Sequence, residues 1–301
     1  MTTELPSIPD HVDRQITPPT TDDVVVRTPG AAERDPVRHT RRRRTIEVVL
    51  AISIPVALIG LWQLAASEGW IDRILYPAPS DVITEGRRQF ADFNYGHDVW
   101  VTVKRILWGF FYGSVIGVAV GLVMGMSRTV RAALEPTLSA LYTVPKLALL
   151  PVFLIIFGVG EKPVIVILAV TVFFFVWIQT MASVMSVPEG YREAAVSFGV
   201  TRRQMFRHVI LPAALPQIFV GLRIAAGVAV LTVIGVEFVF APGFAGLGYR
   251  INNARQTFVP KQAYVGIVIS AIIGVIFIWI VKRIGRALSP WAPEDNAIGA
   301  R

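Results

Sequence analysis

Six apolar segments, each long enough to cross a lipid bilayer, set the strongest limit on how this chain can fold. They cover residues 46–66, 106–126, 134–157, 163–184, 216–240 and 263–281. With a helical rise of about 1.5 Å per residue, a segment of about 20 residues spans roughly 30 Å of hydrocarbon. The sequence therefore predicts an all-α, polytopic membrane protein with six transmembrane helices.

Composition agrees with this prediction and excludes several other classes of protein. Apolar residues make up 53% of the chain, charged residues 17%, and the mean hydropathy is +0.57, outside the usual range of soluble proteins. The net charge of +8 comes from Lys and Arg at the ends of apolar runs, so we expect no nucleic-acid partner. The chain has no cysteine and four well-separated histidines, so we expect neither thiol chemistry nor a metal site.

Segment composition also predicts the domains and the topology. Residues 1–45 are rich in Pro, Thr, Asp and Arg and predict a disordered tail, 46–284 a transmembrane domain, and 285–301 a second tail. Six crossings place both termini on one side. The flanks on that side hold more Lys and Arg, including four adjacent arginines at 41–44, and such positive flanks are typical of the cytoplasmic side. We therefore expect a multi-pass protein of the cell membrane with both termini in the cytoplasm.

Residues 186–212, here called the polar loop, interrupt the apolar pattern between the fourth and fifth segments. Ser186 and Glu189 have the spacing of a capping box, which predicts a short helix that runs to about Phe198. Gly199 follows at the position where a helix ends in a left-handed residue. The topology places the polar loop in the cytoplasm, on the same side of the membrane as the two termini.

The second half of the polar loop repeats this pattern. Thr201 and Gln204 form a further capping-box pair, which predicts a second short helix closed by Pro212. Two interpretations of the whole loop stay open at this point. It can lie as an amphipathic hairpin on the inner leaflet, with its arginines on anionic headgroups. Alternatively its small residues, Ala194, Ala195 and Gly199, suit close docking on another protein.

Glycine recurs at every fourth residue of the second apolar segment. Gly109, Gly113, Gly117, Gly121 and Gly125 fall on one helix face, which then has no side chains. Since lipid supplies no hydrophobic force between helices, such a face predicts tight docking on a neighbouring helix. The contact can be static, or it can slide during a conformational cycle.

The polar loop resembles the EAA loop of permease subunits in ATP-binding-cassette importers. That signature is Glu-Ala-Ala, three residues, Gly, nine residues and Ile-x-Leu-Pro, and here it runs from Glu193 to Pro212 with Val209 in place of Ile. Further segments resemble the nitrate, sulfonate, taurine and bicarbonate branch of these importers: residues 76–80, 105–110, 144–146, 149–151 and 246–249. The resemblance implies a type I ABC importer permease fold.

The resemblance also implies partners and roles. Residues of the loop would dock on a cytoplasmic ABC ATPase and receive its motion: Glu193, Ala194, Ala195, Gly199, Leu211 and Pro212. This chain has no phosphate-binding P-loop, since residues 158–163 lack its spacing and hydroxyl, so ATP and magnesium would be bound by the partner ATPase and no cofactor is expected here. Two ATPases need two loops, for which a homodimer is the simplest arrangement, while a heterodimer stays open. An extracytoplasmic solute-binding protein would select the substrate, such as a sulfonate, taurine, nitrate or a thiamine precursor.

Polar residues inside the apolar segments are the candidates for a translocation path or gate, because each is costly in lipid. They are Lys146, Gln179, Arg223 and Glu237. Arg223 can instead extend its charge to the membrane surface. Glu237 is the first choice for gating, and we expect it to be paired with Lys146 or Arg250, because a bare carboxylate would repel anionic substrates.

Two other classes of membrane protein are less consistent with the sequence. An acyl or glycosyl transferase would need acids or histidines clustered near one membrane surface, and the sequence has no such cluster. A passive channel or secondary transporter would show more intramembrane charge or an inverted repeat. We therefore expect a non-catalytic permease subunit.

Overall fold

The computed structural model describes residues 36–92, 94–240, 243 and 245–292. Every regular element in these residues is a helix. The elements are α2 (Pro36–Ser67), α3 (Pro79–Asp92), α4 (Tyr95–Met126), α5 (Arg128–Thr143), η2 (Lys146–Leu149), α6 (Leu150–Phe157), α7 (Glu161–Met185), α8 (Glu189–Ser197), α9 (Arg202–Gln204), η3 (Met205–Ile210), α10 (Leu211–Val239), α11 (Leu247–Gln256) and α12 (Pro260–Leu288).

The contacts divide the chain into two units within α2. The described part of the first unit is the beginning of that helix, residues 36–55, while the second unit starts at Val56 and holds every other element. Most of the predicted tail, residues 1–35, lies outside the described residues, as do residues 293–301 of the carboxy-terminal segment.

Five helical stretches in the described residues are long and apolar enough to cross a membrane. They are Thr45–Ser67, Tyr95–Met126, Glu161–Met185, Arg202–Val239 and Pro260–Leu288. The predicted segment 134–157 is instead a pair of helices bent by 85°, and it gives a sixth crossing if the pair is one span. The break has a local cause, because Val144 precedes Pro145 and adopts an extended backbone, as residues before proline prefer.

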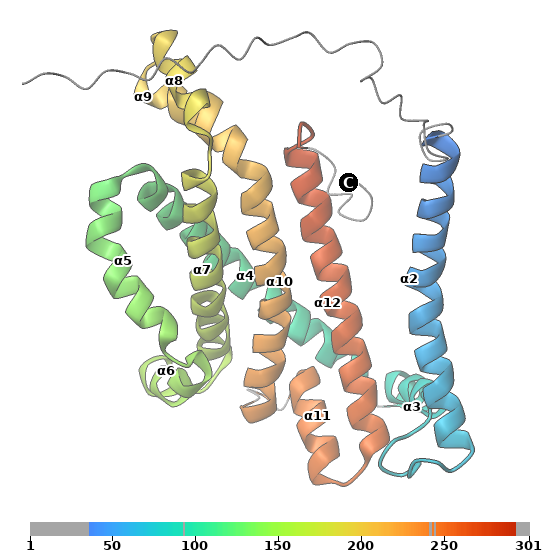
Figure 1. The fold of residues 1–301 in the computed structure, drawn as a ribbon. Helices are drawn as coiled ribbons and strands as arrows, with labels where there is room; N and C mark the ends of the chain where they lie inside the picture. Colours follow the sequence, from blue (N-terminus) through green and yellow to red (C-terminus); the bar gives the residue numbers. More distant parts are fainter. Residues whose placement is uncertain (1–35, 93, 241–242, 244, 293–301) are drawn as a thin grey trace, which may run out of the picture. The chain divides into compact units, whose positions relative to one another are not determined.

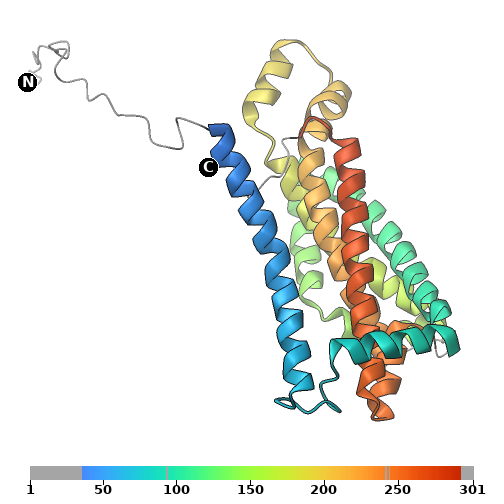
Figure 2. The ribbon, with the colours of Figure 1, turned by 90° about the vertical axis from the view of Figure 1, so that its right-hand side faces the viewer.

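The second unit has two distinct ends (Figure 1). α8 and α9 lie at one end, together with the carboxyl end of α12, while α3 and α11 lie at the other (Figure 2). α7 runs toward the α8–α9 end and α10 runs back from it. We refer to these as the loop end and the opposite end.

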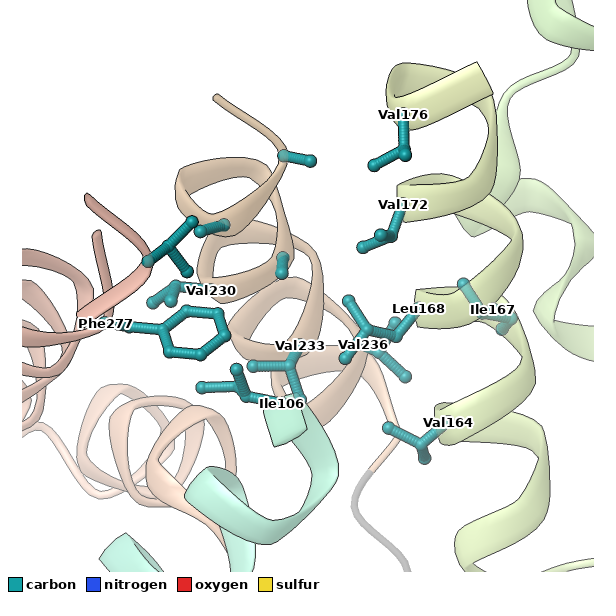
Figure 3. Packing of buried hydrophobic residues seen from close by; sticks show 14 of the residues in the cluster. Ile106, Val164, Ile167, Leu168, Val172, Val176, Val230, Val233, Val236 and Phe277 are labelled. Carbon is teal, nitrogen blue, oxygen red and sulfur yellow. The ribbon is translucent and has the colours of Figure 1, made fainter. Parts of the chain in front are cut away.

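The centre of the unit is an apolar core between α4, α7, α10 and α12. Branched side chains from the facing sides of these helices interlock there, including Leu168 and Val172 of α7, Val233 of α10 and Phe277 of α12 (Figure 3). Small residues of α10, such as Ala225 and Ala229, complete the same cluster. Packing of this kind holds transmembrane helices together by close contact.

The α4 glycines lie along the contact between α4 and α7, and all five are buried. A Cβ atom at Gly117 would come within 2.9 Å of the Phe173 carbonyl oxygen, and one at Gly121 within 2.6 Å of the Thr180 Cβ. No larger residue fits without moving one helix. The two helices therefore touch backbone to backbone along most of their length, and we call this contact the glycine seam.

Candidate functional site

The polar loop forms the helix, glycine, helix arrangement predicted from its sequence. α8 ends at Ser197, and Gly199 has a φ of 68°, the left-handed conformation that glycine adopts at low cost. The Thr201 hydroxyl accepts a hydrogen bond from the Gln204 amide, and the Gln204 side chain accepts one from the Thr201 amide at 2.8 Å. This second capping box is confirmed.

Two details of the loop differ from the prediction. The first capping box is wrong, because α8 begins after Pro188 without a side-chain cap, and the Ser186 hydroxyl donates backward to the Ser183 carbonyl at 3.0 Å. Pro212 also does not close the second helix. It lies in the first turn of α10, where proline needs no N–H and its fixed φ suits a helix, so the chain continues from α9 through the π-helical turn η3 into α10.

Each helix of the loop is attached to a different spanning helix. The Arg192 side chain of α8 donates from Nη2 to the Val184 carbonyl at the end of α7, at 2.9 Å. α9 continues into α10 as one helical stretch, Arg202–Val239. The Trp291 indole donates to the Pro212 carbonyl at 3.2 Å, which ties the segment after α12 to the start of α10. Sequence reasoning missed both Arg192 and Trp291.

The outer surface of the polar loop is open and partly apolar. Glu193 and Ala194 are exposed, Ala195 is buried, and the Phe198 side chain is 86% exposed. Leu211 and Pro212 are half-buried at the base of the loop. A hollow of about 760 Å³ runs between α8 and the start of α10, lined by Ala194, Ala195, Phe198, Val209 and Pro212 among others. This is a surface of small and aromatic groups around a concavity.

A buried ion-pair cluster lies at the opposite end of the unit. The Arg105 guanidinium of α4 donates to Glu237 of α10 at 2.8 Å and to both carboxylate oxygens of Glu161 of α7 at 2.7 Å. The side chains of Arg105 and Glu237 are fully buried, whereas that of Glu161 is 40% exposed. One guanidinium thus joins three spanning helices, and we call this group, with Asp98 and Thr102, the Arg105 cluster.

Further donors complete the coordination of the buried carboxylates. Glu237 accepts the Thr102 hydroxyl at 2.9 Å and the Gly248 amide at 3.0 Å. Asp98 accepts the Gly246 amide at 2.8 Å and the Arg250 side chain at 2.7 Å. The expected pairing of Glu237 with Lys146 or Arg250 is therefore wrong. Glu237 pairs with Arg105, and Arg250 pairs with Asp98.

A sequence signal for this cluster existed in the spacing of α4. Asp98, Thr102 and Arg105 are three or four residues apart and continue the helix face that carries the glycine seam. From the sequence alone, Arg105 is one of the cations at the ends of apolar runs. The pairing itself could not be read from the sequence, because Arg105 and Glu237 are 132 residues apart.

The other polar candidates occupy separate places. Lys146 lies at the break between α5 and α6, where its ammonium donates to the Tyr142 carbonyl and lies 4.9 Å from the Phe174 ring centre. Gln179 of α7 packs against Gly221 of α10. Arg223 lines a cavity between α10 and α12. The structure thus gathers none of these three into the Arg105 cluster, and the described residues contain no group of metal-ligating side chains.

Comparison with known proteins finds relatives among transport permeases. Residues 113–291 match a family described as the binding-protein-dependent transport system inner membrane component. The taurine transport system permease protein of Escherichia coli strain K12 is 32% identical over 266 residues, which cover 85% of this chain and 96% of that protein. A bicarbonate transport system permease protein of Synechococcus elongatus is 30% identical over 244 residues, covering 77% of this chain and 84% of that one.

A solved structure has a similar fold. A chain of the inward-facing MetNI methionine ABC transporter superposes with a TM-score of 0.55 and 25% sequence identity, covering 63% of this chain and 94% of that one. The putative aliphatic sulfonates transport permease protein of Bacillus subtilis strain 168 is 30% identical over 256 residues, which cover 85% of this chain and 92% of that relative.

Proposed function

The chain belongs to the family of binding-protein-dependent transport system inner membrane components, and on that premise we propose that its polar loop receives the motion of a separate ATPase and passes it to the spanning helices. Members of this family are multi-pass permease subunits of ATP-binding-cassette transporters in the inner membrane. The work of such a subunit is therefore transport, while ATP and magnesium are bound by the partner.

The shape of the polar loop is the observation that carries the docking proposal. Its exposed face combines small residues, Ala194 and Gly199, with larger exposed side chains, Tyr191, Val196 and Phe198, beside a hollow of about 760 Å³. Aromatic anchors surrounded by small residues are typical of protein interfaces. A helix lying on the inner leaflet would present a continuous apolar face to the lipid, whereas here the large side chains stand around a hollow that a side chain of a partner can fill. The six motif residues are therefore the proposed ATPase-coupling site, with the first, second and fourth on the exposed face and the others beneath it: Glu193, Ala194, Ala195, Gly199, Leu211 and Pro212.

Motion at the loop reaches the membrane by two routes. α8 is held to the end of α7 by Arg192, and α9 continues directly into α10. The glycine seam then joins α4 to α7, because the two backbones lie in close contact. If α7 moves, α4 must follow it or the whole contact is lost. A push on the loop therefore displaces α4, α7 and α10, whose opposite ends are joined by the Arg105 cluster.

The Arg105 cluster is proposed as the gating or packing element of the opposite end. Each of its three carboxylates is paired with a guanidinium, Glu161 and Glu237 with Arg105 and Asp98 with Arg250, which weakens the repulsion of an anion that passes nearby. Glu237 is fully buried and saturated with donors, which leaves it no free oxygen for a substrate. Lys146, Gln179 and Arg223 stay proposed contributors to the path or its gate.

The proposed substrate is a small anion or zwitterion of the sulfonate, taurine, nitrate or bicarbonate class, in keeping with the names of the relatives. We propose that an extracytoplasmic solute-binding protein delivers it and that two copies of this chain pair with two ATPases. Uptake of labelled taurine, an alkyl sulfonate and bicarbonate by cells that express this chain tests the class, and uptake of at least one of them should be lost when the chain is deleted. If the cells take up none of the three through this chain but do take up an unrelated solute, the proposed substrate class is wrong.

Variants of the loop test the docking role. Gly199→Trp adds a large side chain at a left-handed position, and Glu193→Lys reverses a charge on the exposed face. Both should abolish co-purification of the ATPase and ATP-driven uptake while the chain still inserts, and Glu193→Lys should also keep the thermal unfolding midpoint. Gly69→Trp is the matched control for Gly199→Trp, because Gly69 is an exposed glycine with a φ of 77° and open space, so it carries the same backbone strain outside the polar loop. Retention of the ATPase by both loop variants would disprove the contact.

A labelling experiment tests the orientation. The chain has no cysteine, so single cysteines at Ser197 and Gly96 report on the two ends separately. With the loop and both termini in the cytoplasm, an impermeant thiol reagent added to intact cells should label position 96 and leave position 197 unlabelled. The reverse pattern would place the loop outside and end the coupling proposal.

A further inference from the structure

A basic cavity lies between α10 and α12 near the loop end, separate from the polar loop and from the Arg105 cluster. Its volume is about 400 Å³. Three cationic side chains line it: Arg223 of α10, and Lys282 and Arg286 of α12. None of its lining residues in the described chain is acidic.

The cavity is built by close contact of the two helices. At its floor Gly285 of α12 meets Phe219 of α10, where an added Cβ would come within 2.8 Å of the ring. Ser289, Pro290 and Ala292 form the wall toward the loop end. The neighbouring Trp291 is tied to the Pro212 carbonyl, which keeps this wall in place.

Apolar surface continues from the cations toward the middle of the spans. Val275 is two helical turns before Lys282 on the same face of α12, and its side chain is 68% exposed. On α10, Ile224 is exposed beside Arg223, and Leu231 is 76% exposed two turns further on. Polar groups at the cavity and apolar strips leading away from it match a molecule with a charged head and an apolar tail.

From this arrangement we infer that the basic cavity binds the phosphate-bearing headgroup of an anionic phospholipid. Basic pockets between spanning helices near a membrane surface suit such headgroups. Arg and Lys together can neutralise and hydrogen-bond a phosphate diester. The acyl chains would follow Val275 and Leu231. A bare phosphate would fill only a small part of the cavity and would not use these apolar strips.

Another cation on the same helix provides the contrast. Arg283 is next to Lys282 in sequence but does not line the cavity, and its guanidinium packs 5.7 Å from the Trp279 ring centre. It has the same charge and nearly the same depth as Lys282. Any effect that depends only on basic charge near the membrane surface should therefore be equal at the two positions.

The experiment measures lipid retention by native mass spectrometry of the purified full-length chain. Wild type should retain phosphatidylglycerol in preference to phosphatidylcholine. The double variant Lys282→Gln/Arg286→Gln should weaken phosphatidylglycerol binding by roughly 30-fold, since each cation near an anionic headgroup contributes about 1 kcal/mol. Arg283→Gln should leave it unchanged. Equal retention by wild type and the double variant, or an equal loss in Arg283→Gln, would overturn the assignment.

Two further arms separate other occupants. Inorganic phosphate added to delipidated wild type should raise the thermal unfolding midpoint far less than phosphatidylglycerol does; an equal rise would identify a soluble anion instead. A chain ending at Ala292 lacks the acidic residues Glu294 and Asp295 and should retain phosphatidylglycerol as the intact chain does. Retention by the shortened chain alone would mean that the cavity serves the protein's own acidic segment, and the lipid proposal would be wrong.

Discussion

The two ends of the second unit handle polar groups in opposite ways. At the opposite end, charged side chains are buried among four helices and hydrogen-bonded on every side, as Arg105 is by Glu161 and Glu237. At the loop end, Glu193 and Phe198 face outward, and α8 is held by one arginine contact to α7. The difference assigns separate mechanical tasks: one end joins the helices, and the other presents a surface that another protein can move.

Because its charged groups are buried, a change at the opposite end should cost more folding free energy than a change at the loop end. A buried charge that loses its partner keeps its desolvation cost, while an exposed charge is taken up by water. The four predictions below change one group at a time at the two ends and along the seam between them.

The largest effect is expected for Glu237→Ala. It leaves Arg105 buried with only Glu161 as a carboxylate partner and should destabilise the folded state by about 3–5 kcal/mol, the usual cost of breaking a buried pair. Thermal unfolding of the purified chain measures this. Glu161→Ala is the control, and it should cost clearly less because water can reach its 40% exposed site. Similar unfolding midpoints for Glu237→Ala and wild type would contradict the role of the cluster.

The glycine seam should show the next largest effect. Gly121→Leu places a Cβ within 2.6 Å of Thr180 and 2.8 Å of the Trp177 carbonyl, so α4 and α7 must separate. Overpacking of this kind costs roughly 1–3 kcal/mol. Gly60→Leu is the matched control, since that glycine of α2 has open space around it. If Gly121→Leu lowers the thermal unfolding midpoint no more than Gly60→Leu does, the glycine seam does not couple α4 to α7.

A smaller and local effect is expected at the loop end. Thr201→Ala removes the cap of α9, a loss of about 1 kcal/mol, and should increase amide hydrogen exchange of residues 202–205 roughly fivefold. The global unfolding midpoint should not change. Ser197→Ala serves as control, because its hydroxyl donates to the Glu193 carbonyl within a helix and caps nothing. Unfolding of the whole protein by Thr201→Ala would erase the contrast between the ends.

The smallest effect tests whether burial or location makes the difference. Arg73 and Asp81 form an ion pair at 2.8 Å in which the Arg73 side chain is 54% exposed and that of Asp81 18%, and Asp81 belongs to α3 at the opposite end. The Arg73 hydrogen bond holds the pKa of Asp81 below its ordinary value of 3.8. The pair therefore stabilises the fold above that value and stops doing so as the pH falls through the lowered pKa.

Arg73→Gln should accordingly lower the unfolding midpoint only slightly at neutral pH, and the difference from wild type should vanish in acid. Unfolding measured across the acidic range gives both quantities. A loss as large as that of Glu237→Ala would mean that position at this end, and not burial, sets the cost.

Much of this arrangement follows from local sequence. The spans, the glycine face of α4, the left-handed Gly199 and the Thr201 cap are all set by residues within a few positions of one another. The family signature in the loop likewise depends on spacing along the chain. Such features can be predicted because helix periodicity and capping are short-range effects.

The errors have long-range or competing causes. Glu237 finds Arg105 through the fold, and no pattern near either residue indicates it. Ser186 prefers a carbonyl of the preceding helix to the cap that its spacing offers. Pro212 falls in a first turn, where the usual rule that proline ends a helix does not apply. The bend between α5 and α6 depends on one residue before a proline inside an otherwise apolar run.

The length of the helical stretch from Arg202 to Val239 determines how far it can extend beyond the membrane. Its 38 residues extend about 57 Å at the usual helical rise, while a bilayer with both headgroup layers measures roughly 40–45 Å. Because this helical path is longer than the bilayer is thick, the stretch leads from within the lipid to the polar loop outside it. A water-soluble protein can thus bind the end of this stretch without entering the headgroup layer.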